Sequence, residues 1–242
     1  MLVGATAACG GSSSSSTSTG PKSIVALGDS VPSGYNCKCT PYPQLSAQGL
    51  ATKSGQSVTA TNDAVGGYTT GDVLQQVDSN KAIIDELRTA DVVEIEIGAN
   101  DVPYNAKSCG TSVDCYAPLV PPVRKNLDAI VARVRDLTSG HKALVVLLDY
   151  WSIWLGGTYA RDKGHEYVSA ARRMTAQVDE AIRASADASG SAYVDLRRAF
   201  KGPSFGEKES KYLTSDGDHP NATGHQAIAT ATEAVIENAL HI

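Results

Sequence analysis

The stretch "IVALGDSVPSGY", from Ile24 to Tyr35, decides the fold. A short apolar run ends at Gly28-Asp29-Ser30, and a stretch of small residues follows. The pattern is typical of a buried strand that turns into a helix. Ser30 could be a reactive serine or only a helix cap, because Asp and Ser favour turns and N-caps. A reactive serine requires a base, an acid that orients the base, and donors for an oxyanion.

Apolar strand-like runs alternate with helical patterns from residue 23 onward. The predicted strands are Ile24–Leu27, Val58–Ala64, Val92–Ile97, Leu144–Leu148 and Ala192–Leu196. The predicted helices are Tyr42–Ser54, Thr70–Arg88, Val123–Leu137, Glu166–Ala188 and roughly Ala222–Leu240. This alternation predicts a parallel sheet with helices on both faces. Ligands bind at the carboxyl ends of such strands, so each catalytic residue should closely follow a strand.

Length and charge narrow the class of protein. The chain has 242 residues and a formal net charge of −5. It fits one α/β domain with a substantial core. The negative charge and the lack of a dense Lys/Arg run argue against nucleic acid as a partner. After the N-terminal segment, no stretch is apolar for long enough to span a bilayer. We expect a monomer.

The N-terminal segment differs from the rest of the chain. Residues 1–22 are predicted to be a signal remnant and a disordered Ser-rich linker, and residues 23–242 the folded domain. The small residues before Cys9 resemble the end of a bacterial lipoprotein signal, although there is no basic n-region and Thr6 stands where Leu is usual. We expect an extracellular or cell-surface protein, with Cys9 as a candidate membrane tether. The alternative is a disordered tail with a chance cysteine.

Four further cysteines are consistent with export. Cys109 and Cys115 enclose a short loop that is easy to bridge, which would leave Cys37 to pair with Cys39. The other two pairings tie the two loops together, and four free thiols are a further alternative. Metal binding is not expected, because neither pair has C-x-x-C spacing and no histidine is near in sequence.

One of the five histidines has the setting of a general base. His219 lies in the polar loop "SDGDHPNATGH", just before the last predicted helix. Asp216 stands three residues earlier, a spacing that lets a carboxylate reach the imidazole Nδ1 across one turn. Asp218 is adjacent to His219 and would have to fold back sharply. The alternative is an Asp-rich turn that caps the helix.

Oxyanion donors are available after the second and third strands. Gly66 and Gly67, in "TNDAVGGYTTGD", let the backbone approach a ligand, and the Asn100 amide in "IEIGANDVPY" can donate a second hydrogen bond. The backbone N–H of Ser30 can donate a third. Ordinary turns and caps are the alternative for each. The strand before Asn100 also carries Glu94 and Glu96, and we expect at least one of them to be hydrogen-bonded.

Four ordered blocks, "GDSVPSGY", "NDAVGGYTT", "IGAND" and "DGDHPNATGH", resemble the SGNH hydrolases, also called GDSL-type esterases and lipases. The resemblance runs from Ser23 to near the end of the chain and is greatest to exported actinobacterial members. It implies a three-layer α/β/α sandwich with a flavodoxin-like five-stranded parallel sheet. It also implies Ser30, Asp216 and His219 as the catalytic residues, an oxyanion hole of Ser30, Gly67 and Asn100, and no metal or cofactor.

The same resemblance implies a serine ester hydrolase that cleaves carboxylic esters through an acyl-enzyme. The alternatives are a polysaccharide or peptidoglycan O-deacetylase, a thioesterase, and a non-catalytic carbohydrate- or lipid-binding module. Aromatic residues near the blocks are candidates for a substrate pocket, or else they pack under the loops. They are Tyr35, Tyr68, Tyr104, Trp151 and Trp154.

Overall fold

A five-stranded, all-parallel sheet forms the centre of the computed structural model, which describes Met1 and residues 20–242. The strand order is β2-β1-β3-β4-β5, the flavodoxin-like order predicted by the resemblance. The strands are β1 (Ser23–Gly28), β2 (Thr59–Asn62), β3 (Val92–Glu96), β4 (Leu144–Leu148) and β5 (Ala192–Val194). The predicted linker, including Cys9, lies almost wholly outside the described residues.

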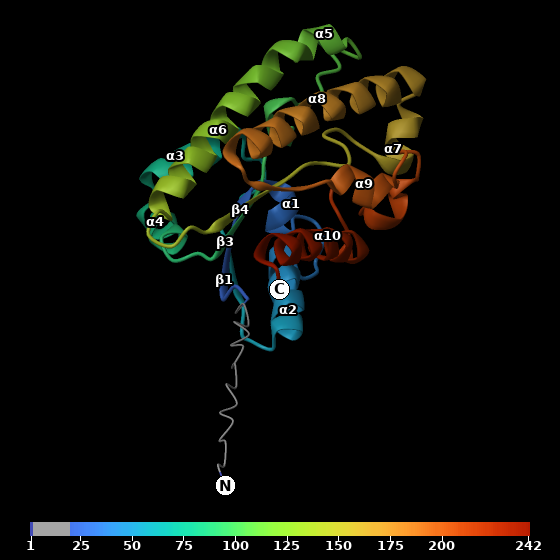
Figure 1. Ribbon diagram of the computed structural model, residues 1–242. Coiled ribbons are helices and arrows are strands. Elements are labelled where there is room, and N and C mark those ends of the chain that lie inside the picture. The colour runs from blue at the N-terminus through green and yellow to red at the C-terminus, as the bar shows by residue number, and fades with distance from the viewer. Residues whose placement is uncertain (2–19) are drawn as a thin grey trace.

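Helices cover both faces of the sheet, as Figure 1 shows. On one face α3, α6 and α8 pack side by side, and on the other α2 packs against α10. The α-helices are α1 (Ser30–Ser33), α2 (Tyr42–Ser54), α3 (Thr70–Ser79), α4 (Lys81–Leu87), α5 (Val113–Tyr116), α6 (Val120–Leu137), α7 (Gly157–Asp162), α8 (His165–Ser189), α9 (Leu196–Lys201) and α10 (Ala222–Leu240). Short 3-10 helices are η1 (Ala99–Asp101), η2 (Ala117–Leu119) and η3 (Glu209–Tyr212). The protein is therefore a three-layer α/β/α sandwich.

The predicted helix 70–88 is in fact two helices. Asn80 has extended backbone angles, φ −81° and ψ 105°, and its side chain accepts a hydrogen bond from the backbone N–H of Ala82. Asn80 thus ends α3 and caps α4, because an Asn side chain competes well with the helical backbone. The helix predicted from Val123 begins earlier, at Val120, and takes the two prolines into its first turn.

Gly28 lets the first strand lie close to the third at the point where Ser30 follows. Its φ is +151°, and a Cβ added there would lie 2.1 Å from the carbonyl oxygen of Glu96. Any larger residue would push β1 away from β3. The glycine of the opening stretch therefore fixes where Ser30 sits relative to the end of β3.

Glu94 and Glu96 are fully buried in β3, and the Glu94 carboxyl makes no hydrogen bond within the part of the chain that the structure describes. The Tyr42 hydroxyl is a hydrogen-bonding neighbour of Glu96 and lowers the Glu96 pKa in part, so the expectation of one partnered carboxylate stays a prediction. Burial raises the pKa of both groups well above the usual range. Nearby acids act in the same direction, chiefly Glu233 for Glu94 and Asp29 for Glu96. The core tolerates these residues because they stay protonated and uncharged.

Glu94→Gln is expected to weaken the dependence of stability on pH. Because its pKa is raised, Glu94 stays protonated to a higher pH in the folded protein than in the unfolded chain. The pKa difference therefore contributes its full free energy of unfolding below the unfolded pKa. That contribution declines by about 1.4 kcal/mol per pH unit as the pH rises from the unfolded pKa toward the folded pKa. Urea denaturation between about pH 5 and about pH 7 should show a smaller loss for the variant than for the wild type. Equal losses in the wild type, Glu94→Gln and the exposed control Glu166→Gln would contradict this view of Glu94.

The structure pairs Cys109 with Cys115 and Cys37 with Cys39. Reductant is expected to lower the melting temperature by about 5 °C, because opening the seven-residue Cys109–Cys115 loop returns conformational entropy to the unfolded chain and so lowers stability by about 2 kcal/mol. The test is a thermal melt with and without reductant. A Cys109→Ser/Cys115→Ser variant should already melt low and respond little. An unchanged wild-type melting temperature would argue against this bond.

Candidate active site

Ser30 is the first residue of α1, at the carboxyl end of β1. Asp29, rather than Ser30, caps this helix: one of its carboxyl oxygens accepts the Val31 N–H at 3.0 Å and the other accepts the Tyr150 hydroxyl at 2.6 Å. The Ser30 hydroxyl makes no hydrogen bond to any described residue. The structure therefore gives the cap to Asp29 and leaves the Ser30 hydroxyl available.

His219 and Asp216 are hydrogen-bonded in the loop before α10. The Nδ1 atom of His219 lies 2.8 Å from Oδ2 of Asp216, and the His219 backbone N–H donates to Oδ1 at 3.0 Å. The neighbouring Asp218 carboxylate is 4.0 Å from the same Nδ1, beyond hydrogen-bonding distance. The close contact at Nδ1 leaves Nε2 as the ring nitrogen that can serve a nucleophile.

Asp216 is held as a carboxylate. Burial alone would raise its pKa, but hydrogen bonds from the Thr214 hydroxyl, the Asp218 backbone N–H, the Asn36 amide and His219 lower it well below the usual value. All of these groups donate to the ionised form. Asp216 is thus suited to orient His219 and to stabilise the imidazolium cation.

The loop after α1 joins the serine to the histidine loop. Tyr35 donates its backbone N–H to the Ser30 carbonyl at 3.0 Å, and its ring centroid lies 4.8 Å from that of His219. The next residue, Asn36, donates its side-chain amide to Oδ2 of Asp216 at 2.8 Å. Sequence reasoning missed Asn36. The stretch reads as a turn, but nothing in it indicates which distant carboxylate the amide reaches.

The glycine loop after β2 lies against Ser30. A Cβ added to Gly66 would be 3.8 Å from the Ser30 Cβ, whereas one added to Gly67 would meet nothing within 4 Å. Gly67 has φ +85° in a turn closed by a hydrogen bond from the Tyr68 N–H to the Val65 carbonyl at 3.2 Å. Gly67 thus has the open space that an oxyanion donor needs, and its role remains a prediction.

Asn100 lies in η1, directly after β3, and is tied to the glycine loop. Its side-chain amide donates one hydrogen bond to the Tyr68 carbonyl at 2.8 Å. Asp101 links the same two loops, because it accepts a hydrogen bond from the Thr70 backbone N–H at 2.9 Å. An amide NH₂ has two donors, so the second N–H of Asn100 stays available for an oxyanion.

The five candidate pocket aromatics fall into two groups. Tyr35 is 59% exposed beside His219, and Tyr68 is half-buried in the glycine loop. Trp151 and Trp154 are only 2% and 4% exposed, which favours the alternative that they pack under the loops. Trp154 also donates to the Val102 carbonyl at 2.8 Å, and the half-buried Tyr104 packs against its ring.

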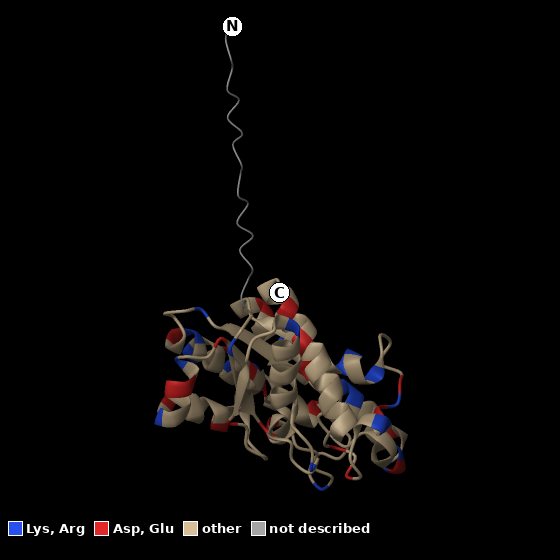
Figure 2. Ribbon diagram, turned by 90° about the horizontal axis from the view of Figure 1, so that it is seen from below, with Lys and Arg blue, Asp and Glu red and all other residues tan. Residues whose placement is uncertain are grey.

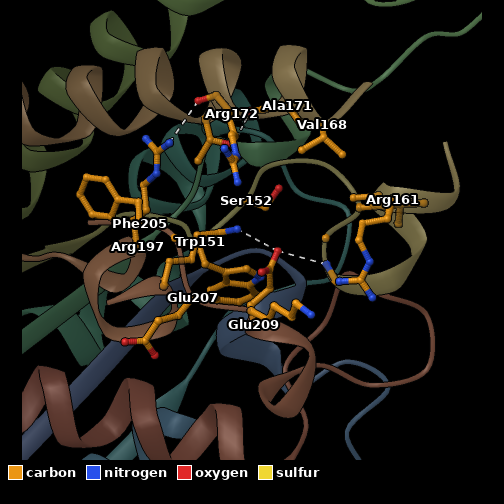
Figure 3. Close-up of a pocket in the computed structure, with 18 residues that line it drawn as sticks. Trp151, Ser152, Arg161, Val168, Ala171, Arg172, Arg197, Phe205, Glu207 and Glu209 are labelled. Carbon is orange, nitrogen blue, oxygen red and sulfur yellow. Dashed lines mark hydrogen bonds and ion pairs between the residues drawn. The ribbon is translucent and has the colours of Figure 1, made fainter. Parts of the chain in front are cut away.

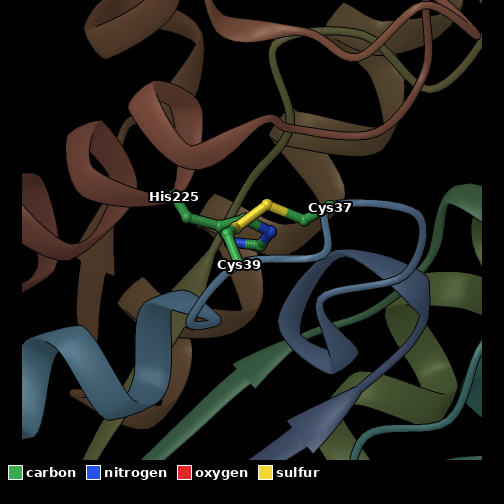
Figure 4. A group of neighbouring side chains, drawn as sticks. All are labelled: Cys37, Cys39 and His225. Carbon is green, nitrogen blue, oxygen red and sulfur yellow. A yellow bond between two sulfur atoms is a disulfide. The ribbon is translucent and has the colours of Figure 1, made fainter.

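A histidine distant in sequence lies beside the first disulfide. Figure 4 shows the His225 ring next to the bond between Cys37 and Cys39, and the three ligand atoms lie within 4.8 Å of one another. The sulfur atoms are bonded to each other, so they are not free thiolates. His225 Nδ1 accepts the Tyr42 backbone N–H at 3.3 Å, and burial lowers the His225 pKa to about 4. In this state the trio has the chemistry of a structural contact rather than of a metal site.

A serine hydroxyl and a loop amide at the carboxyl ends of parallel strands, with an Asp–His pair, are the parts of a serine hydrolase. Asp216 and His219 follow η3 rather than a strand. The expectation that each catalytic residue closely follows a strand therefore holds only for Ser30, Gly67 and Asn100. The chain belongs to the GDSL-like lipase/acylhydrolase family, whose model matches residues 26–227. This membership makes the protein a serine-type carboxylic ester hydrolase.

Solved structures share the fold at low sequence identity. The lipase Lip_vut3 from a goat rumen metagenome has a TM-score of 0.69 and 18% identity, over 88% of this chain and 97% of that one. The acetylxylan esterase Axe2 from Geobacillus stearothermophilus has a TM-score of 0.65 and 19% identity, over 90% and 96%. LAE5, described as an alpha/beta hydrolase from a Lake Arreo metagenome, has a TM-score of 0.63 and 22% identity, over 90% and 96%. No curated protein matches the chain.

Proposed function

We propose that Ser30 is the nucleophile of an ester hydrolase whose base is His219, oriented by Asp216. The 2.8 Å contact between His219 Nδ1 and Asp216 carries the proposal, because it holds the imidazole with Nε2 available. Nε2 takes the Ser30 proton as the hydroxyl attacks the ester carbonyl. The leaving alcohol then receives that proton, and water releases the acyl group from the serine by the reverse sequence.

The oxyanion of each tetrahedral intermediate is proposed to bind three donors. They are the backbone N–H groups of Ser30 and Gly67 and the free side-chain N–H of Asn100. Their loops follow β1, β2 and β3, which are neighbours in the sheet. Hydrogen bonds between the loops hold these donors in place before substrate arrives.

Asn100→Ala is expected to lower kcat by about 100- to 1000-fold with little change in KM, because the amide acts mainly on the transition state. Hydrolysis of p-nitrophenyl acetate gives both constants. Asn126→Ala is the matched control, since the Asn126 amide donates to the Thr70 hydroxyl at 2.9 Å within the scaffold. A loss that appears mainly in KM, or equally in the control, would contradict the oxyanion role.

We propose polymer-borne short acyl esters as the substrate class. Tyr35, Gly66 and Gly67 beside Ser30 are all exposed, which supports a substrate whose alcohol part is large. One structural neighbour is named as an acetylxylan esterase, which agrees with O-deacetylation of a polysaccharide as the second candidate function. A p-nitrophenyl ester chain-length series, run beside acetylated xylan and peptidoglycan, tests both. A clear preference for long acyl chains would overturn this substrate class, and a lack of hydrolysis of every ester would overturn the catalytic proposal.

An extracellular or cell-surface location, with a monomeric chain and a candidate tether at Cys9, remains a proposal. The two cysteine pairs support it, because disulfides persist mainly outside the cytosol. No helix within the described residues has the length and apolar character to cross a membrane. Loss of membrane association in a Cys9→Ser variant would support the tether, and unchanged fractionation would overturn it.

A further inference from the structure

A second concave site lies beyond the carboxyl end of β4. A cavity of about 200 Å³ is enclosed by the loop after β4, by α7, by the first half of α8, and by α9 and the segment that follows it. Figure 3 shows side chains from these elements converging on it, with Trp151 at its base. None of the proposed catalytic or oxyanion residues lines this cavity.

The lining is strongly cationic. Five basic side chains and only two carboxylates border the cavity: Arg161, Arg172, Arg197, Lys201 and Lys208, with Glu207 and Glu209. Figure 2 shows Lys and Arg gathered on the side of the molecule that carries α7 and α9. The protein as a whole has a net charge of −5, so this local excess of positive charge opposes the overall balance.

The two lining carboxylates do not neutralise Arg161 and Arg172. Glu209 lies 2.9 Å from the Lys201 ammonium and accepts the Gly157 N–H at 3.1 Å. In Figure 3 the Glu207 carboxylate points away from Arg172 and Arg161. Among the described residues, neither of these two guanidinium groups has an ion pair or a side-chain hydrogen bond. Arg161 and Arg172 are both exposed, so two guanidinium groups without a carboxylate partner border the cavity on its solvent side.

Arg197 is fixed in place and keeps a donor unused. Its guanidinium carbon lies 4.9 Å from the centre of the Phe205 ring, and Nη2 donates to the Arg172 carbonyl at 3.3 Å. Nη1 forms an ion pair with the buried Asp179 carboxyl at 3.6 Å, longer than a hydrogen bond, and the buried Nε has no partner among the described residues. Arg197 is therefore held at the wall of the cavity by the Phe205 ring, the Arg172 carbonyl and the Asp179 carboxyl.

Apolar groups line the rest of the cavity. Phe205, Val168 and Leu155 border it, above the buried Trp151 ring that stacks on Phe200. One wall is shared with the catalytic loop, because the lining residue Gly156 donates to the Gly217 carbonyl at 2.6 Å. Gly217 lies between Asp216 and His219 in sequence, so the cavity adjoins the back of that loop.

We propose that this cavity is an anion-binding site for a carboxylate or phosphate group carried on a small body, held by Arg161, Arg172 and Arg197. Arginine forks pair with such groups in two-point geometry, and the apolar wall accepts the ligand body. The anion has two candidate sources, a free metabolite or the acidic part of an ester substrate. Binding at this site does not depend on Ser30 being the nucleophile.

Titration calorimetry with inorganic phosphate, D-glucuronate and the neutral control D-glucose tests the site. Saturable one-to-one binding of phosphate or glucuronate, without binding of glucose, is the expected result. The same titration on Ser30→Ala should give unchanged affinity, which separates this proposal from the catalytic one. If neither anion binds saturably at millimolar concentration, the proposal is overturned.

Arg161→Gln/Arg172→Gln should weaken anion binding at least about tenfold, because each change removes a charge-assisted contact. Arg173→Gln is the matched control: Arg173 is the next residue on α8, donates to the Ser169 hydroxyl at 2.7 Å and does not line the cavity. Thermal melts check that both variants fold. Equal weakening in the control would overturn the site in favour of general surface charge.

An ester that carries a second carboxylate distinguishes the two sources. If the wild type prefers p-nitrophenyl hemisuccinate to p-nitrophenyl acetate, and the double variant loses that preference, the bound group belongs to the substrate. If phosphate binds but the two enzymes show the same ester preference, the site serves a free anion. In both cases the anion contacts the same arginines.

Discussion

Ser30→Ala is expected to lower kcat/KM for p-nitrophenyl acetate by roughly 10,000-fold or more, because it removes the hydroxyl on which the proposed acyl-enzyme forms. The variant should fold normally. The Ser30 hydroxyl makes no hydrogen bond to a described residue, and Asp29 rather than Ser30 caps α1. Steady-state kinetics with a matched thermal melt separate a chemical effect from a structural one.

Ser33→Ala is the control for this experiment. Ser33 lies in the same short helix, and its hydroxyl donates to the Ser30 carbonyl at 2.9 Å. Removing one such bond should cost about 1 kcal/mol of stability and little activity. If Ser30→Ala keeps more than about one-hundredth of the wild-type rate, or if the two variants lose activity equally, Ser30 is not the nucleophile.

The sheet was predictable because its signals are local. Runs such as Leu144–Leu148 are short and wholly apolar, and the structure places that strand at the predicted residues. The last helix, Ala222–Leu240, also has its predicted bounds. The short helices α7 and α9 were not predicted, because six-residue helices are too short to show a clear period. The break at Asn80 was missed because a polar residue inside a helical pattern usually only faces solvent.

The proposed site was predictable where spacing alone determines contact. Asp216 and His219 are three residues apart, and a single turn brings their side chains together. Asn36 was not predictable, since it reaches Asp216 from 180 residues away through a contact that only the fold creates. The contact of His225 with the Cys37–Cys39 bond was not predictable for the same reason, because the three residues come together only in the folded chain.

Burial was the hardest property to predict. Glu94 and Glu96 alternate with apolar residues, a pattern that usually indicates one polar face, yet β3 is central and buried on both faces. The tryptophans after β4 were equally ambiguous, because an aromatic side chain near a site can line a pocket or fill the core. Sequence shows that these side chains lie near the end of a strand, but not which layer covers them.

Asp216→Asn is expected to reduce kcat about 10,000-fold while leaving the fold intact. Oδ2 of Asp216 faces both the Nδ1 atom of His219 and the side-chain amide of Asn36, each at 2.8 Å. An asparagine at this position has two possible orientations. In the first, its NH₂ group faces His219 Nδ1 and the Asn36 amide, which are both donors in the wild type. In the second, its oxygen faces these two groups, and its NH₂ group faces the Thr214 hydroxyl and the backbone N–H groups of Asp218 and His219. In the first case the imidazole is driven to the tautomer with the proton on Nε2, which cannot accept the Ser30 proton. The charge that stabilises the imidazolium is lost in both cases.

Asp218→Asn is the matched control, because it removes a neighbouring carboxylate without touching the hydrogen bond to Nδ1. The Asp218 oxygen lies 4.0 Å from that nitrogen, and burial raises the Asp218 pKa, whereas the pKa of Asp216 is held low. The Asp218→Asn control should therefore keep most of the wild-type kcat. In the wild type, Asp216 should remain ionised throughout the mildly acidic range. Rate–pH profiles of the three proteins make the comparison. If Asp218→Asn loses as much activity as Asp216→Asn, charge near the histidine matters rather than its hydrogen bond, and the assignment of Asp216 as the orienting acid fails.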